Sequence, residues 1–371
     1  MRHTRAYIDV KPSDWSNWRW QQQNRVTTLG ALERIVGLTH DERTAFSESK
    51  NRFKVAITPY YLSLIDLDNP QCPIRQQAVP ATGELRTWPG ELEDPLAEEK
   101  HMPVPGLTHR YPDRALLYVT HNCAMYCRFC TRKRKVGDAA SAPKKIDLAA
   151  AFEHIRRTPA IRDVIISGGD PLSLSNERLA LILETLATID HVEIVRIGTR
   201  NLVTLPQRID SEFVSLLKQV QSRHLAVWVM THFNHPRECT ELAFDACDRI
   251  TSSGTPIQNQ MVLLRGINDS VHTVTTLNKR LLRMRVKPYY ILQADLAEGV
   301  GHFRTSIDTG LQLIQGLRGH VSGLAVPQYV VDLPHGGGKV ALVPESRVRE
   351  TPEYIVFRNY QGREICIPKR R

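Results

Sequence analysis

Three cysteines stand close together in the stretch HNCAMYCRFC, at Cys123, Cys127 and Cys130. Thiolates are soft ligands that suit iron–sulfur clusters or zinc. A closed structural metal site normally has four protein ligands, whereas a site that must meet a small molecule keeps one position open. The spacing therefore predicts either a metal centre with one open position or a zinc site completed by a distant ligand such as His121 or Cys239.

A glycine-rich turn, SGGDP at residues 167–171, follows a strongly apolar run. Glycine permits a close approach of the backbone to a ligand, and the Asp170 carboxylate can accept hydrogen bonds from an ammonium group. By itself such a motif is more often only a turn. It becomes a candidate binding element because it would lie beside the cysteines.

Strand-like and helical elements alternate between residues 115 and 318, and these elements would position the residues named above. Amphipathic segments such as DLAAAFEHIRR and NERLALILETLATI, the latter preceded by Ser175, separate short β-rich runs. The runs are 115–120, 163–168, 192–197, 225–231, 256–264 and 287–293. Six strand–helix units predict parallel strands joined by right-handed crossovers, and six are fewer than the eight of a closed barrel. We therefore expect an α/β fold, a partial (β/α)6 barrel with its active site at the carboxyl ends of the strands.

Three regions follow from the pattern. Residues 1–105 form an N-terminal helical region, because DWSNWRWQQQNR has helical periodicity and the prolines of MPVPG indicate a linker. Residues 106–320 form the barrel. Residues 321–371 form a C-terminal segment with a strand, a glycine turn before Lys339, a second strand and a tail, CIPKRR.

The whole composition narrows the class of protein. The 371 residues are 42% hydrophobic and 24% charged, lack an apolar run of about 18 residues, and begin without a secretory signal, so we expect a cytoplasmic globular protein. Seven cysteines, an odd number, argue against a disulfide framework. The net charge of +10 is spread along the chain and disfavours nucleic-acid binding as the main role.

The cysteine motif, with Phe129 before the last cysteine, resembles the signature of the radical S-adenosylmethionine (SAM) superfamily. Further stretches of the sequence resemble the lysine 2,3-aminomutase family, which lies within this superfamily. The matching stretches include PGLTHRYPDRALL, IRDVIISGGD, HVEIVRIGTR, THFNHP, NQMVLLRGIND, PYYILQADL and VVDLPHGGGK. The likeness covers about residues 10–345.

The resemblance implies a radical SAM barrel, a [4Fe–4S] cluster on the three cysteines and SAM on the open iron. It assigns contacts with SAM to Ser167, Gly168, Gly169, Asp170, His232 and Gln260. It also implies that Lys339 carries pyridoxal phosphate (PLP) and that Arg110 and Arg114 hold the PLP phosphate and ring. These residue types suit the binding of PLP, because a guanidinium fork fits phosphate and a partly desolvated lysine attacks an aldehyde readily.

Three charges are implied to select the substrate. Arg132 would bind its carboxylate, and Asp295 and Asp332 its distal ammonium group; two carboxylates facing one pocket repel each other unless a cation lies between them. The implied activity is an isomerase that moves the α-amino group of L-lysine to the β carbon through a 5′-deoxyadenosyl radical. L-arginine or another cationic amino acid is the alternative substrate. An external flavodoxin- or ferredoxin-like electron donor would be needed.

The sequence departs from the family at several positions. Ser270 stands where a zinc-binding cysteine is expected, and Cys366 is the lone cysteine near the end, so we expect no structural zinc. Leu292 replaces an expected tyrosine and His335 a glycine. We still expect a homo-oligomer and no membrane partner. The rival from another class is a zinc or iron–sulfur protein that binds nucleic acid or modifies RNA.

Overall fold

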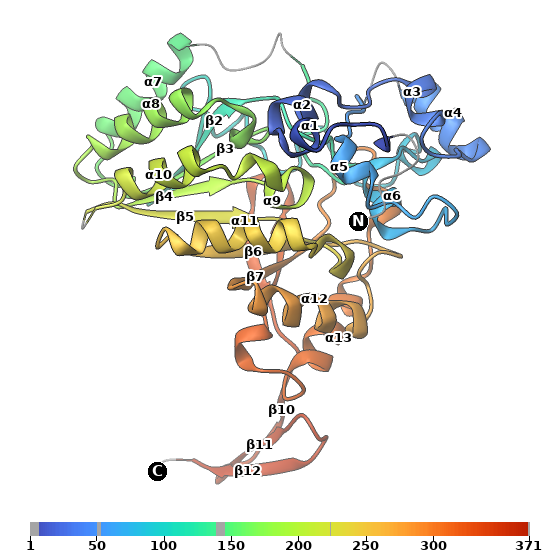
Figure 1. Ribbon diagram of the computed structural model, residues 1–371. Coiled ribbons are helices and arrows are strands. Elements are labelled where there is room, and N and C mark those ends of the chain that lie inside the picture. Colours follow the sequence, from blue (N-terminus) through green and yellow to red (C-terminus); the bar gives the residue numbers. More distant parts are fainter. Residues whose placement is uncertain (1–6, 50–52, 139–144, 223, 370–371) are drawn as a thin grey trace.

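A nine-stranded sheet, β1 to β9 in chain order, forms the centre of the computed structural model, which describes residues 7–49, 53–138, 145–222 and 224–369 (Figure 1). Strands β2 to β8 pair in parallel, and β1 and β9 add antiparallel edges. The strands are β1 (Leu107–Tyr111), β2 (Arg114–Thr120), β3 (Asp163–Gly168), β4 (Ile194–Gly198), β5 (Ala226–Thr231), β6 (Ile257–Leu263), β7 (Val286–Gln293), β8 (Gln328–Leu333) and β9 (Gly338–Leu342).

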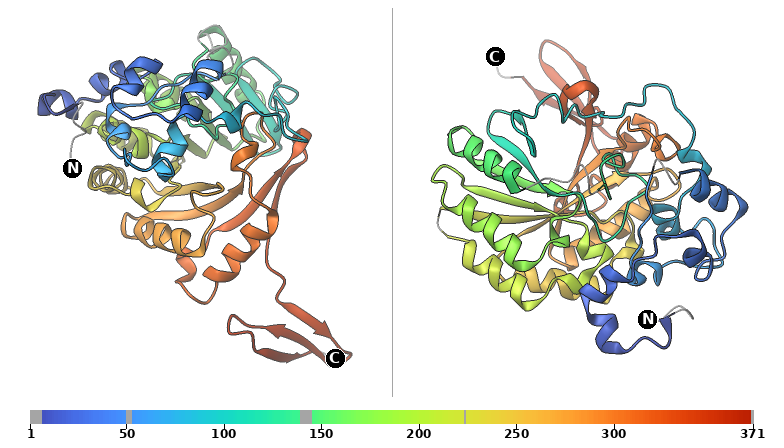
Figure 2. Two further views of the ribbon diagram at one scale, coloured as in Figure 1. Left: turned by 90° about the vertical axis from the view of Figure 1, so that its right-hand side faces the viewer. Right: turned by 90° about the horizontal axis from the view of Figure 1, so that it is seen from above.

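Helices connect successive parallel strands and cover the outside of the curved sheet (Figures 1 and 2). The connecting helices are α7 (Lys145–Arg156), α8 (Asn176–Ala187), α9 (Asn201–Thr204), α10 (Ser211–Val220), α11 (Glu241–Ser252), α12 (Val271–Arg283) and α13 (Ile307–Leu317). Side chains of Asp210, Thr240, Ser270 and Ser306 accept hydrogen bonds from the first turns of α10 to α13. Ser175 precedes α8 without making such a bond.

All six predicted strands are confirmed as β2 to β7, and the mixed α/β architecture of a partial barrel is confirmed with them. The sheet has one more parallel strand than the six predicted, because α13 returns the chain so that β8 pairs with β7. The lysine-bearing strand β9 then folds back on β8. Both strands at 328–342 therefore extend the barrel sheet.

Short helices form the N-terminal region, as predicted, and pack beside the loops at the carboxyl ends of the strands (Figure 2). The Thr58 hydroxyl donates to the Thr204 carbonyl at 2.6 Å, and the Tyr61 hydroxyl donates to Glu238 at 3.0 Å. These helices are α1 (Pro12–Ser16), α2 (Trp18–Gln23), α3 (Leu29–Glu33), α4 (His40–Ser49), α5 (Pro59–Leu62) and α6 (Pro73–Ala78).

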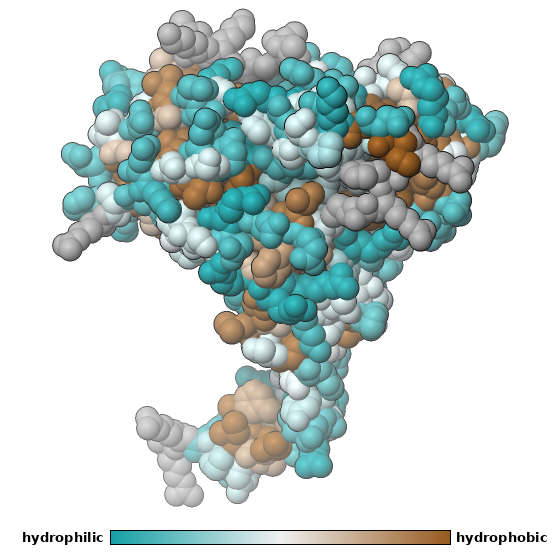
Figure 3. All heavy atoms as spheres, in the orientation of Figure 1, coloured by the Kyte–Doolittle hydropathy of each residue, from teal (hydrophilic) through white to brown (hydrophobic). Residues whose placement is uncertain are grey.

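A separate three-stranded antiparallel sheet projects from the barrel at the C-terminal end (Figures 1 and 2). Its strands are β10 (Arg347–Glu350), β11 (Tyr354–Arg358) and β12 (Glu364–Pro368). The sequence predicted a tail at CIPKRR, but Cys366 pairs with Val356 and lies within β12. Apolar side chains are exposed on this sheet (Figure 3), among them Ile365 and Ile367. Within the described ranges, no helix has the length and apolar character that crossing a membrane requires.

Candidate active site

A cavity of about 370 Å³ opens at the carboxyl ends of the parallel strands. Loops after β2, β3, β4, β5 and β7, together with β6, β8 and β9, supply its walls. The predicted site residues that line it are Cys123, Cys127, Cys130, Arg132, Ser167, Gly168, Gly169, Asp170, His232, Gln260, Asp295, Asp332 and Lys339. The arrangement follows from parallel pairing, which brings the ends of successive strands to one edge. Arg110 and Arg114 lie outside this lining.

The three thiols line the same cavity. Burial, and then the negative charge of Cys127, raise the pKa of Cys130 to about 11, and burial also raises the pKa of Cys123. Among the described residues, no group of three His, Cys, Asp or Glu side chains is placed to hold a single metal ion. Three thiolates in one cavity suit a cluster with a separate iron for each cysteine, whereas a structural zinc ion would need a fourth ligand. Neither His121 nor Cys239 lines the cavity.

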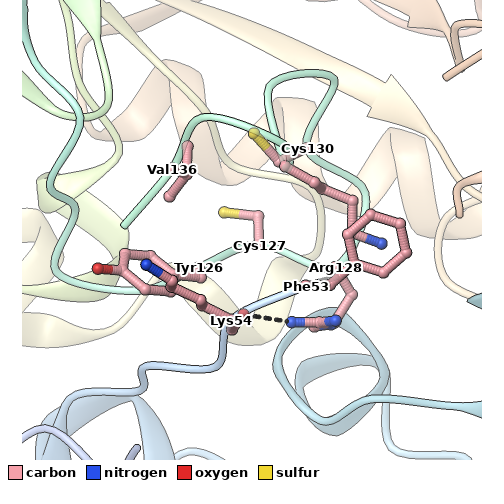
Figure 4. A pocket seen from close by; sticks show the side chains of 8 residues that line it. Phe53, Lys54, Tyr126, Cys127, Arg128, Cys130 and Val136 are labelled. Carbon is pink, nitrogen blue, oxygen red and sulfur yellow. Dashed lines mark hydrogen bonds between the residues drawn. The ribbon is translucent and has the colours of Figure 1, made fainter. Parts of the chain in front are cut away.

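A buried ionic group anchors the cysteine loop to the N-terminal region. Arg128, inside the cysteine motif, donates to Glu84 at 2.9 Å, and Lys133 donates to Glu84 at 2.8 Å. Although burial raises it, these two cations bring the pKa of Glu84 down to about 2. Arg128 also donates to the Lys54 carbonyl at 2.9 Å (Figure 4). These bonds hold the cysteine loop against the N-terminal region.

The glycine-rich turn packs closely against the end of β2 and the loop that follows it. Gly168 has φ +116°, and an added Cβ would lie 2.3 Å from the Thr120 carbonyl oxygen; at Gly169 it would lie 2.4 Å from that of Asn122. The Asp170 carboxylate accepts bonds from the Leu172 amide, the Thr199 hydroxyl and the Arg200 amide at 2.7–3.0 Å. Asp170 therefore shapes the turn, and its contact with the ammonium group of a ligand stays a prediction.

His232 lines the cavity and has a polar atom without a partner among the described residues. Its Nε2 is buried and has no hydrogen-bond partner, while the ring lies 5.4 Å from that of Phe129 between centroids. Burial, and then the charge of Arg200, lower the pKa of His232 to about 3. A neutral imidazole with an unsatisfied nitrogen fits a polar ligand such as SAM in this part of the cavity.

Arg200 is a site residue that the sequence analysis missed. Its guanidinium donates to the Cys127 sulfur at 2.9 Å, to Glu238 at 2.8 Å and to Gln77 at 2.7 Å. Its Nε donates to the His232 carbonyl at 3.1 Å. Arg200 thus links the cysteine loop with the loops after β4 and β5. The only sequence signal was its place at the end of the β4 run, in IGTR.

Lys339 and Asp332 face each other across the β8–β9 hairpin and form an ion pair. The Tyr111 hydroxyl accepts a bond from the Lys339 amide at 3.1 Å. Arg110 has a buried nitrogen without a partner, and a Cβ on Gly338 would lie 3.7 Å from it. The Lys339 amine follows Gly338 in the chain, and this Arg110 nitrogen has no partner among the described residues, so the two suit a cofactor that carries an aldehyde and a phosphate. His335, at φ 57°, takes the left-handed turn before these glycines.

The remaining predicted arginines already have contacts. Arg132 donates to Glu98 at 2.6 and 3.0 Å and to the Ser167 hydroxyl at 3.2 Å. Glu98 was missed, because nothing in its local sequence marks it as buried. Arg114 pairs with the exposed Asp113 at 3.0 Å and its guanidinium lies 3.9 Å from the Tyr111 ring centroid.

Asp295 and Asp332 lie at one wall of the cavity, as predicted, and also border a neighbouring space of about 530 Å³. Burial, and then the negative charge of Asp332, raise the pKa of Asp295 to about 7, although Lys339 opposes this. Asp332 already pairs with Lys339, so the two carboxylates leave room for one further positive charge. Leu292 lines the same cavity.

Comparisons with known proteins agree with this geometry. The model of the radical SAM superfamily matches residues 117–277, which hold the cysteine motif, and the lysine-2,3-aminomutase model matches residues 314–368, which hold Lys339. L-lysine 2,3-aminomutase of Clostridium subterminale is 47% identical over 97% of this chain and 86% of its own length. This chain belongs to the lysine 2,3-aminomutase family.

Other members of the family show the range of named substrates. L-lysine 2,3-aminomutase of Bacillus subtilis is 48% identical over 95% of this chain and 74% of its own length. Glutamate 2,3-aminomutase of Clostridioides difficile is 43% identical over 97% of this chain and 84% of its own length. These identities are close, so they do not by themselves decide between the two named substrates.

Proposed function

We propose that this family member moves the α-amino group of L-lysine to the β carbon, with L-arginine as the second candidate substrate. The observation that supports lysine is the pair Asp295 and Asp332 in the wall of the cavity that also holds Lys339. A glutamate side chain would bring a third carboxylate to this wall, which Coulomb repulsion disfavours. The chain belongs to the family whichever of these substrates it uses.

The roles of the side chains follow from their chemistry. Cys123, Cys127 and Cys130 would ligate the [4Fe–4S] cluster, and Lys339, with Arg110 nearby, would hold PLP. When bound, the cluster with SAM supplies a radical that abstracts hydrogen, and PLP supplies a conjugated system for the migrating nitrogen. The protein's part is to orient these groups and exclude water.

Arg132 remains the proposed partner of the substrate carboxylate. Its bonds to Glu98 hold the guanidinium at the cavity, and its bond to Ser167 points it toward the glycine-rich turn. Glu98 is buried and its pKa is lowered because the attraction of Arg132 outweighs the effect of burial. It thus acts as a fixed anion that positions Arg132.

The raised pKa of Asp295 predicts that affinity for lysine depends on pH. Below about pH 7 the free site holds a proton on Asp295, which must leave before a cation can lie between two carboxylates. Affinity should therefore rise with pH, roughly tenfold between pH 6 and pH 8. Calorimetric titration of lysine at several pH values measures it. Asp295→Asn should remove the gain, and a flat profile in the unchanged protein would contradict the prediction.

The function is tested by an anaerobic assay of the reconstituted protein with PLP, SAM, dithionite and L-lysine, L-arginine, L-ornithine or L-glutamate. Mass spectrometry should find β-lysine as the main product, and Asp332→Asn should reduce its formation more than it reduces cleavage of SAM. A β-amino acid from glutamate alone would overturn the proposed substrate. Metal analysis of the same sample tests the expected lack of structural zinc. That expectation rests on Ser270, which replaces a cysteine, and on the exposed Cys366, the lone cysteine near the end of the chain.

A further inference from the structure

A second cavity connects the proposed substrate site with the surface. It has a volume of about 530 Å³ and shares Asp295 and Asp332 with the large cavity. No residue in the lining of the large cavity is exposed. The lining of the second cavity, in contrast, includes the exposed residues Arg265, Ser306, Ile307 and Pro334. The second cavity therefore extends from the surface to the two carboxylates.

Two arginines in the lining of the second cavity have no partner for their charge. The Arg265 amide donates to the Phe303 carbonyl at 2.8 Å, which brings Arg265 beside the residue that precedes Arg304. Neither guanidinium pairs with a carboxylate in the part of the chain that the structure describes. Because a guanidinium fork matches the two oxygens of a carboxylate, this pair of arginines suits a ligand that carries one.

Further hydrogen-bond donors belong to the same lining. The Trp88 indole nitrogen and the Thr305 hydroxyl are buried and have no partner among the described residues. Both groups can donate to an acceptor oxygen. The first turn of α13 also borders the cavity, and the positive end of a helix dipole favours negative charge. The Glu91 carboxylate accepts from the Trp88 and Gly301 amides at 3.2 and 2.9 Å and is not part of the lining.

The charges of the second cavity match the two ends of a cationic amino acid. The carboxylate of L-lysine or L-arginine would meet Arg265 and Arg304, and its side-chain cation would meet Asp295 and Asp332. These two aspartates also hold that cation in the proposed substrate site. The amino acid can thus pass between the cavities while its cation keeps the same partners and its carboxylate moves from Arg304 to Arg132.

We infer that the second cavity is the entry vestibule for the amino acid, where Arg265 and Arg304 capture its carboxylate. The inference rests on the proposed function for the class of substrate, and on the unpaired guanidiniums and the exposed rim for the place of capture. Arg304 positions the incoming amino acid and does not touch the reacting atoms. Its removal should slow entry and release alike and leave the equilibrium affinity nearly unchanged, because the vestibule is a passage and not the final site.

The test measures how fast L-lysine enters the reconstituted, PLP-loaded protein without SAM or reductant. Stopped-flow absorbance of the bound PLP follows the entry. Arg304→Gln should lower the association rate constant about tenfold at low ionic strength and change the dissociation constant less than about twofold. High salt should shrink the difference because it screens the attraction. Arg304→Lys should retain most of the rate.

Cadaverine is the matched control ligand, because it has the two ends of the lysine side chain as amines but lacks the carboxylate. It should enter the Arg304→Gln variant as fast as the unchanged protein. Equal slowing for cadaverine would mean that Arg304 only supports the fold, and would overturn the inference. A weaker equilibrium affinity for L-lysine with a normal association rate would place Arg304 in the final site, and would also overturn it.

Two further variants guard against a general effect of charge. Arg265→Gln should slow the entry of L-lysine in the same way as Arg304→Gln. Arg178→Gln should not, because Arg178 is an exposed arginine on α8, outside both cavities. Normal association rates in both vestibule variants, or equal slowing in Arg178→Gln, would contradict the inference.

The vestibule and the proposed function can fail separately, because entry is measured without turnover. Entry of L-lysine or L-arginine that depends on Arg304, in a protein that forms no β-amino acid, would refute the function alone. Normal formation of β-lysine with entry that is independent of Arg265 and Arg304 would refute the vestibule alone. If neither amino acid changed the absorbance of PLP, both would be refuted.

Discussion

Lys339→Ala is expected to lower formation of β-lysine by about 10³-fold or more, because it removes the only amine in the cavity lining of the described residues that could bind PLP covalently. The visible absorbance of protein-bound PLP should change, while the iron content should stay the same. Absorbance spectra, iron analysis and the product assay on one preparation measure all three quantities.

The charge of Lys339 must be separated from its nucleophilicity, since the ion pair with Asp332 is also lost in the alanine variant. Lys339→Arg retains a cation opposite Asp332 but cannot bond to the aldehyde at neutral pH. We expect it to be as inactive as the alanine variant. Lys279→Ala, on the surface of α12, serves as the control. Activity above a tenth of normal in Lys339→Arg would contradict a covalent role.

Cys127→Ala is expected to abolish both cleavage of SAM and formation of β-lysine. Cys127 lies between the other two cysteines in the motif and accepts a bond from Arg200 at 2.9 Å. Iron should fall from about four atoms per chain to a small fraction of that, because a cluster held by two thiolates is poorly retained. Bound PLP should persist. The expected pattern is thus the reverse of that for Lys339→Ala.

Cys239→Ala separates the cluster from a zinc site, because a zinc ion completed by Cys239 would be lost in that variant. We expect normal iron content, since Cys239 lies outside the cavity lining. Cys366→Ala, in the exposed strand β12, controls for loss of any thiol. Retention of a full cluster in Cys127→Ala would refute the ligand assignment.

Arg200 connects the cysteine loop with distant parts of the chain, so the loop does not act as an isolated motif. The residue is buried and contacts Cys127, Glu238, Gln77 and His232. Hydrogen bonds to cluster sulfurs influence reduction potential, so the bond from Arg200 to the Cys127 sulfur would tune a cluster that Cys127 ligates. The four contacts come from separate parts of the chain, which explains why sequence patterns did not reveal them.

Local patterns in the sequence determined much of the protein. Short β-rich runs predicted β2 to β7, and amphipathic segments predicted the crossover helices. The spacing of three cysteines predicted a metal-binding loop, which stays a prediction. These features depend on neighbours within a few residues, so the sequence expresses them directly. Glycines before Lys339 likewise predicted a turn, although His335 and not glycine adopts one of its left-handed positions.

Only the tertiary structure decided which distant residues meet. It placed β8 beside β7, Glu98 against Arg132, and Arg200 against Cys127, and it showed that the Asp170 carboxylate holds the turn. The physical reason is that partners of buried charges are selected by chain crossovers and by exclusion of water, which no short stretch of sequence contains.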